Sequence, residues 1–494
     1  MTNQAIYNLD YDGRHIDTGK WPKASITLSP RIGFTYDVFG DKSLKVRGGT
    51  GLFSGRLPLV FFTYMPTNGG MLQYQAQINA DDAKKKGFTM NEFKGGPIAS
   101  LDALKNKLYQ LGYPQAVSPE DGTVPSAICG VDPKFKMPQV WKSSLAIDYQ
   151  FPVSFPFTIT AEGIFNKTVN AVCISDWSIP NVGGFPRLNG VDDRPVYPDG
   201  FRNGTKAFVL ENTKKGYGWS ANVTLNLQPF EWMSLMAAYT HTVQKEITGM
   251  PGSNAESAFT YVPTVEGPNN IKLHNSQFVT PDRIVASATL HDKSGNHYSL
   301  IYESWRGGSC ESYMMVNDMN KDGYQYDAVY VPTDAEASYY DASGNLHGSG
   351  AFRFASEDDM ARFMDFVHND NYLKKRQGKY AEPYSVYSPW VHRLDFSYKH
   401  DFTVRAGKTK HTLQLSLDVK NLLNFFNSSW GVSKYMNPDL TDGRILESKA
   451  DADKNGYAVF VTPSYINSNT VTWKPNPSVG QCWNASVGIK YIFN

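Results

Sequence analysis

The stretch His411–Lys420, which reads HTLQLSLDVK, decides the fold class of this chain. From position 413 onward, leucine or valine alternates with a polar or charged residue. Successive side chains of a β-strand point to opposite faces, so this alternation predicts a strand with one apolar and one polar face. The same alternation occurs at 219–228, 393–399 and 483–493. The chain is therefore expected to be all-β, with long strands of this kind.

Extended along the whole chain, the pattern predicts eleven strands. Their length of about 11 to 15 residues exceeds the roughly 5 to 6 residues usual in globular proteins, and it suits tilted strands that cross a membrane. The predicted strands are 25–37, 43–53, 139–151, 156–168, 216–228, 231–244, 277–291, 296–306, 386–399, 410–423 and 482–493.

The connections between these strands alternate between short and long. Short turns are expected at 39–42, 152–155, around Pro229, at 292–295 and at 402–408. Long loops are expected at 54–138, 169–215, 245–276, 307–385 and 424–481. Short turns at one rim and long loops at the other are typical of an outer-membrane β-barrel. A soluble β-sandwich or propeller also alternates apolar and polar residues, but it gives no reason for long loops on a single rim.

The composition excludes several other classes of protein. The 494 residues include 48 Lys and Arg against 47 Asp and Glu, so the formal net charge of +1 gives no field to recruit nucleic acid. No run approaches the roughly 18 apolar residues of a membrane helix. Charges of both signs on the polar faces, among them Arg47, Asp148 and Glu162, suit a hydrated barrel interior. Residues 1–12 lack a secretory signal, which leaves open a cytoplasmic, a mature or an incomplete chain.

Several segments carry a family resemblance. Ser486, Gly488, Tyr491 and Phe493 resemble the C-terminal assembly signal of outer-membrane barrel proteins, although Asn494 follows the last aromatic residue. Residues 29–58, residues 372–380 with 389–395, and residues 421–431 are similar to barrel segments of TonB-dependent outer-membrane transporters. The likeness is greatest to the branch with a carboxypeptidase-regulatory-like N-terminal domain.

This resemblance implies the C-terminal half of a 22-stranded antiparallel transmembrane β-barrel in the cell outer membrane. Residues 1–24 would be the remnant of an extracellular loop, residues 25–494 the barrel half, and 307–385 its long extracellular loop. Eleven strands cannot close such a barrel, and open sheet edges are not tolerated in lipid. The partners implied are outer-membrane lipid, an N-terminal plug with the first half of the barrel, the TonB energising complex and the barrel assembly machinery.

Two acidic turns reproduce the start of a calcium-binding loop, in which alternate oxygen ligands precede a glycine. The first turn, DMNKDG, begins at residue 318; Val329 replaces the usual twelfth-position glutamate, and a later aspartate could supply a carboxylate. The second turn, DADKNG, begins at residue 451. Both sequences also form ordinary turns without an ion. The candidate calcium ligands are Asp318, Asn320, Asp322, Asp327, Asp451, Asp453 and Asn455; no other cofactor is expected.

The long loop 307–385 is expected to contain a short helix. Ser356 is a suitable N-cap, and apolar residues at 360, 363, 364 and 367 form one helical face. This helix could be a lid over the pore or part of a small loop core. Aromatic side chains of the long loops are the candidate ligand contacts, because sugars and peptides stack on rings, although loop packing would explain them equally: Tyr324, Tyr326, Tyr339 and Trp430.

No catalytic function is expected, because the sequence contains no GxSxG, HExxH, P-loop or Rossmann glycine pattern. The function predicted is the barrel portion of a TonB-dependent active transporter for nutrient uptake, with an oligosaccharide, a peptide or a metal chelate as substrate. The alternative is a surface ligand-binding or adhesive barrel without transport. A soluble all-β binding protein is the third possibility.

Overall fold

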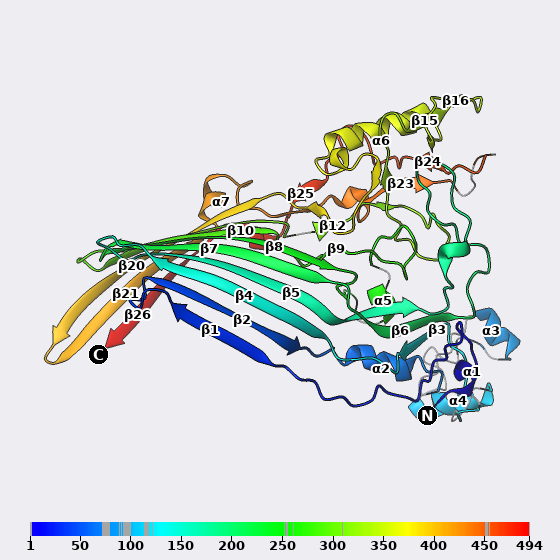
Figure 1. The fold of residues 1–494 in the computed structure, drawn as a ribbon, viewed down its shortest axis with the longest axis horizontal. Helices are drawn as coiled ribbons and strands as arrows, with labels where there is room; N and C mark the ends of the chain where they lie inside the picture. Colours follow the sequence, from blue (N-terminus) through cyan, green and yellow to red (C-terminus); the bar gives the residue numbers. More distant parts are fainter. Residues whose placement is uncertain are drawn as a thin grey trace.

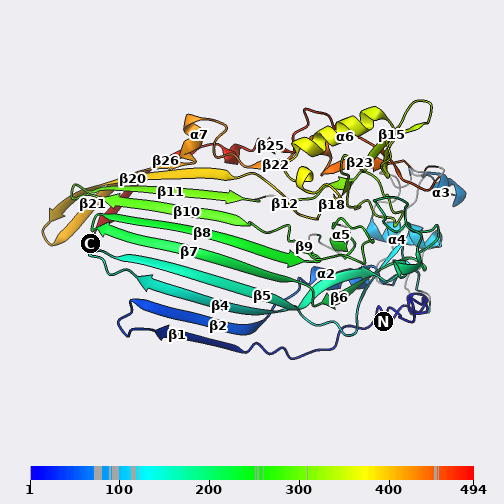
Figure 2. The same ribbon diagram turned by 45° about the horizontal axis from the view of Figure 1, so that its top comes forward.

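The computed structural model shows one large curved sheet with long loops gathered beyond one of its ends (Figures 1 and 2). The structure describes residues 2–71, 80–87, 89, 91, 100–112, 118–120, 122–250, 252, 255–259, 261–308, 310–449, 453 and 455–493. The sheet is called the wall below, and the long loops together are called the loop layer.

Eleven strands form the wall in the described residues, and each pairs antiparallel with the next along the chain. This confirms the predicted number and order of strands. They are β1 (Arg31–Asp37), β2 (Leu44–Ser54), β4 (Gln139–Gln150), β5 (Phe157–Asp176), β7 (Tyr217–Phe230), β8 (Met233–Glu246), β10 (Asp282–His291), β11 (Asn296–Arg306), β20 (Val391–Ala406), β21 (Thr409–Lys420) and β26 (Asn484–Phe493).

Several strand boundaries differ from the predictions. β1 and β10 begin at Arg31 and Asp282, some residues later than expected, directly after Pro30 and Pro281. Proline has no backbone N–H to add to the ladder, which explains both late starts. β20 runs on to Ala406, because its end pairs with the start of β21 across a two-residue turn at 407–408.

The strand register places the apolar side chains of the wall on one continuous face. Leu415 of β21 lies opposite Ile489 of β26, and Leu417 lies opposite Val487. This face is open: Leu415 is 38% exposed and Ile489 is 73% exposed. The wall therefore turns its apolar side outward, as a surface in contact with lipid does.

The opposite face of the wall carries polar side chains that bond to one another. The Arg47 guanidinium of β2 lies 3.0 Å from Asp148 on β4 and 3.6 Å from Glu162 on β5. The amide of Gln414 donates to Asp401 at 2.8 Å. These bonds join neighbouring strands on the face that the sequence assigned to a hydrated interior.

The wall has two edges. In the residues that the structure describes, β1 pairs only with β2, and β26 pairs only with β21. Short turns join the strands at one end of the wall, and the loop layer lies at the other end (Figure 1). The predicted alternation of short and long connections is confirmed, whereas closure into a barrel of 22 strands stays a prediction.

The loop layer contains many short elements that the alternation did not predict. Its helices are α1 (Gln4–Tyr7), α2 (Val60–Thr67), α3 (Ala80–Lys85), α4 (Leu101–Gln110), α5 (Ala255–Phe259), α6 (Glu357–Asn369) and α7 (Leu422–Phe426), with 3₁₀ turns η2 (Val182–Gly184), η3 (Leu373–Lys375), η4 (Pro438–Leu440) and η5 (Val479–Gln481). Its strands are β3 (Ala127–Val131), β6 (Lys206–Thr213), β9 (His274–Asn275), β12 (Cys310–Glu311), β13 (Met314–Met315), β14 (Tyr330–Val331), β15 (Ala337–Tyr340), β16 (Leu346–His347), β17 (Phe352–Phe354), β18 (Lys379–Tyr380), β19 (Val386–Tyr387), β22 (Lys434–Met436), β23 (Arg444–Ser448), β24 (Val459–Val461) and β25 (Trp473–Pro475). Most are too short to show a period of two.

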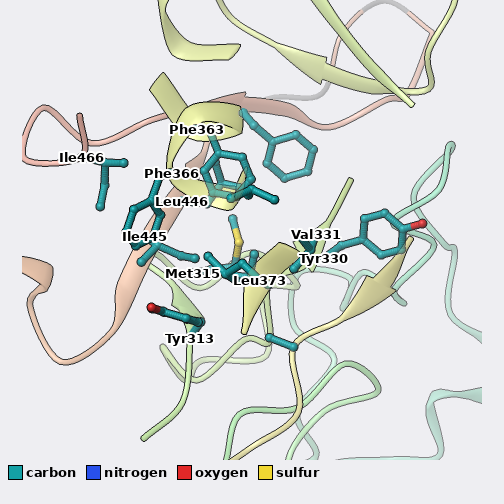
Figure 3. Close-up of a cluster of buried hydrophobic side chains, with 14 of the residues drawn as sticks. Tyr313, Met315, Tyr330, Val331, Phe363, Phe366, Leu373, Ile445, Leu446 and Ile466 are labelled. Atoms are coloured by element: carbon teal, nitrogen blue, oxygen red, sulfur yellow. The ribbon is translucent and has the colours of Figure 1, made fainter. Parts of the chain in front are cut away.

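The predicted helix in the 307–385 loop is confirmed as α6. The Ser356 hydroxyl accepts a hydrogen bond from the Asp359 backbone N–H, as an N-cap does. Phe363 and Val367 of α6 are fully buried in a cluster with residues of β17, β23 and β24 (Figure 3). Of the two interpretations of this helix, the structure supports the loop core, because its apolar face is covered by residues of the 307–385 and 424–481 loops.

The N-terminal residues pack against the loop layer. Ile6, Tyr11 and Ile16 are buried beside Ile128 of β3 and Val209 of β6. The assignment of residues 1–24 as the remnant of an extracellular loop stays a prediction. Among the described residues, no helix combines the length and the apolar character needed to cross a membrane.

Candidate functional site in the loop layer

Three loops enclose a cleft of about 660 Å³ in the loop layer. One wall comes from residues 263–274, between α5 and β10. The second comes from residues around β18, at 376–383, and the third from residues 190–193, before β6. A volume of roughly 300 to 1,000 Å³ is typical of small-molecule sites, so this cleft is the candidate ligand site.

An aromatic pair and a salt bridge order the wall of the cleft around β18. The rings of Tyr330 and Tyr380 pack edge to face with centroids 5.1 Å apart. Arg376 binds Glu382 at 3.1 Å and also donates to the Tyr380 carbonyl oxygen. The lining therefore offers apolar ring surface together with polar groups, a combination that orients a polar ligand.

The sequence did not reveal this cleft. His274, Lys272 and Lys379 line it, yet they lie in two loops that are distant in sequence. No fixed spacing relates such residues, and each stands in an ordinary loop context. The proline, glycine and asparagine residues of segment 263–270 signal a loop but not its partner.

The acidic turn at 318–323 is tightly hydrogen-bonded in the structure. The Asp318 carboxylate accepts the backbone N–H groups of Asp322 and Gly323 at 3.1 and 2.8 Å. Asp322 in turn accepts the Tyr324 N–H at 2.8 Å. The Asn320 side-chain amide donates to Asp322 at 3.1 Å. The structure thus brings three of the predicted calcium ligands into one turn.

Burial dominates the electrostatics of this turn. Burial, together with the nearby carboxylates of Asp327 and Asp318, raises the pKa of Asp322 to about 8. Burial likewise raises the pKa of Asp327 to about 6, against the opposing charge of Arg194. The pKa of Asp318 is also raised by burial, which outweighs its backbone hydrogen bonds. These carboxylates therefore bind protons, or another cation, more readily than exposed ones.

The fourth predicted ligand of the first turn, Asp327, has a different partner. Its carboxylate lies 3.1 Å from the guanidinium of Arg194, and that fully buried guanidinium also binds Asp192 at 2.8 Å. This buried arginine was not predicted from the sequence, although the charged run DDR at Asp192–Arg194 could have indicated it. Asp327 links two loops through this arginine, because Asp192 and Arg194 belong to the loop that follows β5.

The second acidic turn is built around an arginine. Asp453 forms an ion pair with Arg353 and accepts a hydrogen bond from the Tyr340 hydroxyl at 2.7 Å. Burial would raise the pKa of Asp453, but hydrogen bonds from Tyr340 and the backbone, with Arg353, hold it below its usual value. Asn455 is exposed, and Asp451 lies outside the described residues.

Calcium binding stays a prediction for both turns. Within the part of the chain that the structure describes, no group of three or more His, Cys, Asp or Glu side chains is placed to hold a metal ion. The oxygen chemistry of Asp318, Asn320 and Asp322 nevertheless suits calcium.

The four aromatic candidates occupy different environments. Tyr324 is only 7% exposed, and its hydroxyl donates to Asp176 at 3.1 Å, so its ring presents no free face. Tyr326 packs 5.8 Å from the Tyr261 ring, and Tyr339 stacks on His347 at 5.1 Å. Trp430 is 51% exposed. None of the four lines the cleft, and their role in ligand binding stays a prediction.

The residues of the predicted assembly signal lie on the last strand, β26. Tyr491 and Phe493 project from the open apolar face with ring centroids 6.0 Å apart. Gly488 lies opposite Ser416, where a β-carbon would come within 2.7 Å of the serine hydroxyl. Ser486 lies opposite Asp418 on the polar face. The recognition role of these four residues stays a prediction.

Comparison with known proteins agrees with the wall described above. The family model for the outer membrane beta barrel domain matches residues 8–445. The chain belongs to this family. Its predicted outer-membrane location is confirmed by this membership, and so is the all-β barrel-type fold. No protein with a curated description matches the sequence.

Solved structures similar to this outer membrane beta barrel chain include transporters and receptors. The outer membrane transporter YddB from Escherichia coli shares 9% identity at a TM-score of 0.40, with 94% of this chain and 40% of that chain covered. The ferric enterobactin receptor PfeA from Pseudomonas aeruginosa shares 9% identity at a TM-score of 0.34, with 80% and 34% covered. The chain therefore spans less than half the length of these two structures.

Proposed function

We propose that this chain forms the barrel portion of a TonB-dependent active transporter that takes up a nutrient through the outer membrane. The observation that supports this function is the cleft, which three loops build at one end of a wall whose inner face is polar. A ligand caught in such a cleft lies at the entrance to a hydrated interior. The substrate class is an oligosaccharide, a peptide or a metal chelate.

The proposed partners follow from the two edges of the wall. β1 and β26 expose unpaired backbone groups, which lipid does not tolerate. The first half of a barrel would pair with both edges, and a plug would cover the polar inner face. The TonB complex would energise movement of that plug, and the barrel assembly machinery would recognise the end of β26.

Uptake measurements distinguish this function from the alternative, a surface-binding or adhesive barrel. The test compares the uptake of labelled oligosaccharides, peptides and metal chelates by cells with the native polypeptide, cells without it, and cells without TonB. We expect one of the three substrates to enter only when both proteins are present. Binding of a substrate to the cells without any TonB-dependent uptake would support the adhesive alternative and contradict active transport.

The first acidic turn is proposed to bind calcium through Asp318, Asn320 and Asp322. The crowding of buried carboxylates supports this proposal, because a bound cation would compensate charge that burial disfavours. A chelator should then lower the melting temperature of the wild-type protein. If calcium had been present at 100 times its Kd, its removal should reduce the free energy of unfolding by about 2.7 kcal/mol. The same chelator should leave the Asp318→Ala/Asp322→Ala variant unchanged. An equal response of both proteins would contradict the proposal.

A further inference from the structure

One residue of the cleft has a hydrogen-bonding atom without a partner. His274 is 3% exposed, and its Nδ1 lies 2.7 Å from the carbonyl oxygen of Asn275. A carbonyl oxygen only accepts, so Nδ1 carries the proton, and in that tautomer Nε2 is an acceptor. This Nε2 is buried and has no partner among the described residues. A buried acceptor without a donor costs about 1 to 3 kcal/mol, so the site lacks a donor group.

A second acceptor without a donor lies beside it. Glu246 of β8 is the cross-strand partner of His274 in β9, so both side chains lie on the same face of the strand pair. Oε1 of Glu246 is likewise buried without a partner in the described part of the chain. Of these two acceptors, His274 lines the cleft, and its Nε2 fits a ligand that brings an O–H or N–H group.

The cleft lining contains three acidic and three basic side chains, and not all of them are paired with one another. Its acidic side chains have cationic partners: Glu266 binds Arg187 at 2.8 Å, and Glu382 binds Arg376. Asp193 also lies within 3.8 Å of Arg187. By contrast, Lys272 and Lys379 are exposed, and no ion pair within the described ranges joins either of them to an acid. The two lysines therefore offer ammonium groups to an anion.

We infer that the cleft binds a small carboxylated ligand, with its carboxylate at Lys272 and Lys379 and a neighbouring O–H or N–H donor at Nε2 of His274. The rings of Tyr330 and Tyr380 also line the cleft and supply apolar surface. This inference rests on the proposed transport function and narrows its substrate class. Two sources share the required chemistry: oligosaccharides of uronic acids, and short acidic peptides.

The test is calorimetric titration of the complete native polypeptide in detergent. The probes are trigalacturonate, its fully methyl-esterified form, an acidic tripeptide of glutamate residues, and the same tripeptide with every carboxyl group amidated. We expect one carboxylated probe to bind and its neutral counterpart to bind at least tenfold more weakly. Binding of the sugar acid alone, or of the peptide alone, identifies the source. Equal binding of a probe and its neutral form overturns the inference, and so does the absence of binding by both carboxylated probes.

Variants locate the binding in this cleft. Lys272→Ala/Lys379→Ala should weaken the binding of the carboxylated probe by about tenfold, as the loss of two exposed charge pairs of up to about 1 kcal/mol each implies. Lys374→Ala removes an exposed lysine of the same loop outside the cleft and should bind like the wild type. His274→Phe should weaken binding further, whereas His274→Gln keeps an acceptor and should weaken it less. Wild-type affinity in the double lysine variant, whose changes are on the surface, overturns the assignment even if the His274 variants fail to fold.

The outcome for the cleft is separable from the outcome for transport. If TonB-dependent uptake occurs but neither carboxylated probe binds, the transport function stands and the ligand inference is wrong. If a carboxylated probe binds the cleft but no uptake depends on TonB, the ligand inference stands and the transport function is wrong.

Discussion

The wall and the loop layer of this chain solve the burial of apolar side chains in opposite ways. In the wall, apolar residues such as Ile489 point outward and stay open, while polar residues such as Arg47 bond to one another on the inner face. In the loop layer, Phe354 is fully buried and the rings of Phe352 and Phe460 stack at 3.9 Å. The loop layer is therefore stabilised by its own core, whereas the wall requires lipid around it.

This difference shows that one chain can combine two folding environments. The loop layer obeys the rules of a water-soluble domain, in which large-to-small core changes are costly. The wall behaves as a membrane barrel does. A large-to-small change at an outward position should have little effect on its stability, whereas a new charge there should destabilise it strongly. Variants in each region therefore test whether the loop layer and the wall are stabilised in these different ways.

The largest effect is expected in the loop core. Phe354→Ala removes a ring packed against Phe363 and Phe460, which should cost about 3 to 5 kcal/mol in the stability of the loop layer. Hydrogen exchange of the 330–373 backbone amides measures that loss. Phe426→Ala, at an exposed phenylalanine of α7, is the control and should change exchange little. Equal exchange in the two variants would show that the loop layer has no cooperative core.

A charge on the open face of the wall should have the next largest effect. Leu415→Arg places a guanidinium near the middle of the lipid-facing band, at a cost of about 2 to 4 kcal/mol. The neighbouring Gln414→Arg places the same charge on the polar face, next to Asp401. Heat-modifiable migration of the folded protein in gels reports assembly, and we expect it to fall only for Leu415→Arg. Similar assembly of both variants would mean that the two faces are assigned wrongly.

A pH-dependent effect is expected in the loop layer. The pKa of Asp322 rises from 3.8 to about 8 on folding, because burial and neighbouring carboxylates disfavour its charge. The folded state then holds a proton that the unfolded state releases, so stability falls as the pH rises from about 4 to about 8. Melting of the loop layer in the presence of a chelator should show this slope. Asp322→Asn should flatten it, and an unchanged slope in that variant would assign the effect to another group.

The smallest effect is expected at the start of α6. Ser356→Ala removes the side chain that caps the Asp359 N–H, which should cost about 1 kcal/mol. Hydrogen exchange of the first turn of α6 measures the loss, and Ser343→Ala in an exposed turn is the matched control. An equal increase in exchange in Ser343→Ala would show that the loss of the helix cap is not the cause.

The comparison also explains how much of the structure could be predicted. The wall was predictable because its strands run for many residues, so that the alternation around Leu415 and Trp219 is unambiguous. α6 was predictable because Ser356 and Phe363 combine a cap with a helical stripe. Both signals are local in sequence.

What could not be predicted depends on contacts between distant loops. β17 has three residues, too few to show a period. Arg194 meets Asp327, and Arg353 meets Asp453, across more than ninety residues of sequence in each case. The cleft likewise exists only once three loops have folded together. For Asp327 and Asp453, the sequence suggested a metal where the structure shows an arginine partner.

The most direct test of this account is fractionation of the cells that produce the protein, followed by immunoblotting with an antibody against residues 310–385. The central claim is that the eleven-stranded wall is part of a larger barrel in the outer membrane. The account predicts a band in the outer-membrane fraction at roughly twice the 55.2 kDa of this chain, since a 22-stranded barrel has about twice its strands. A band found only in the soluble fraction would contradict it.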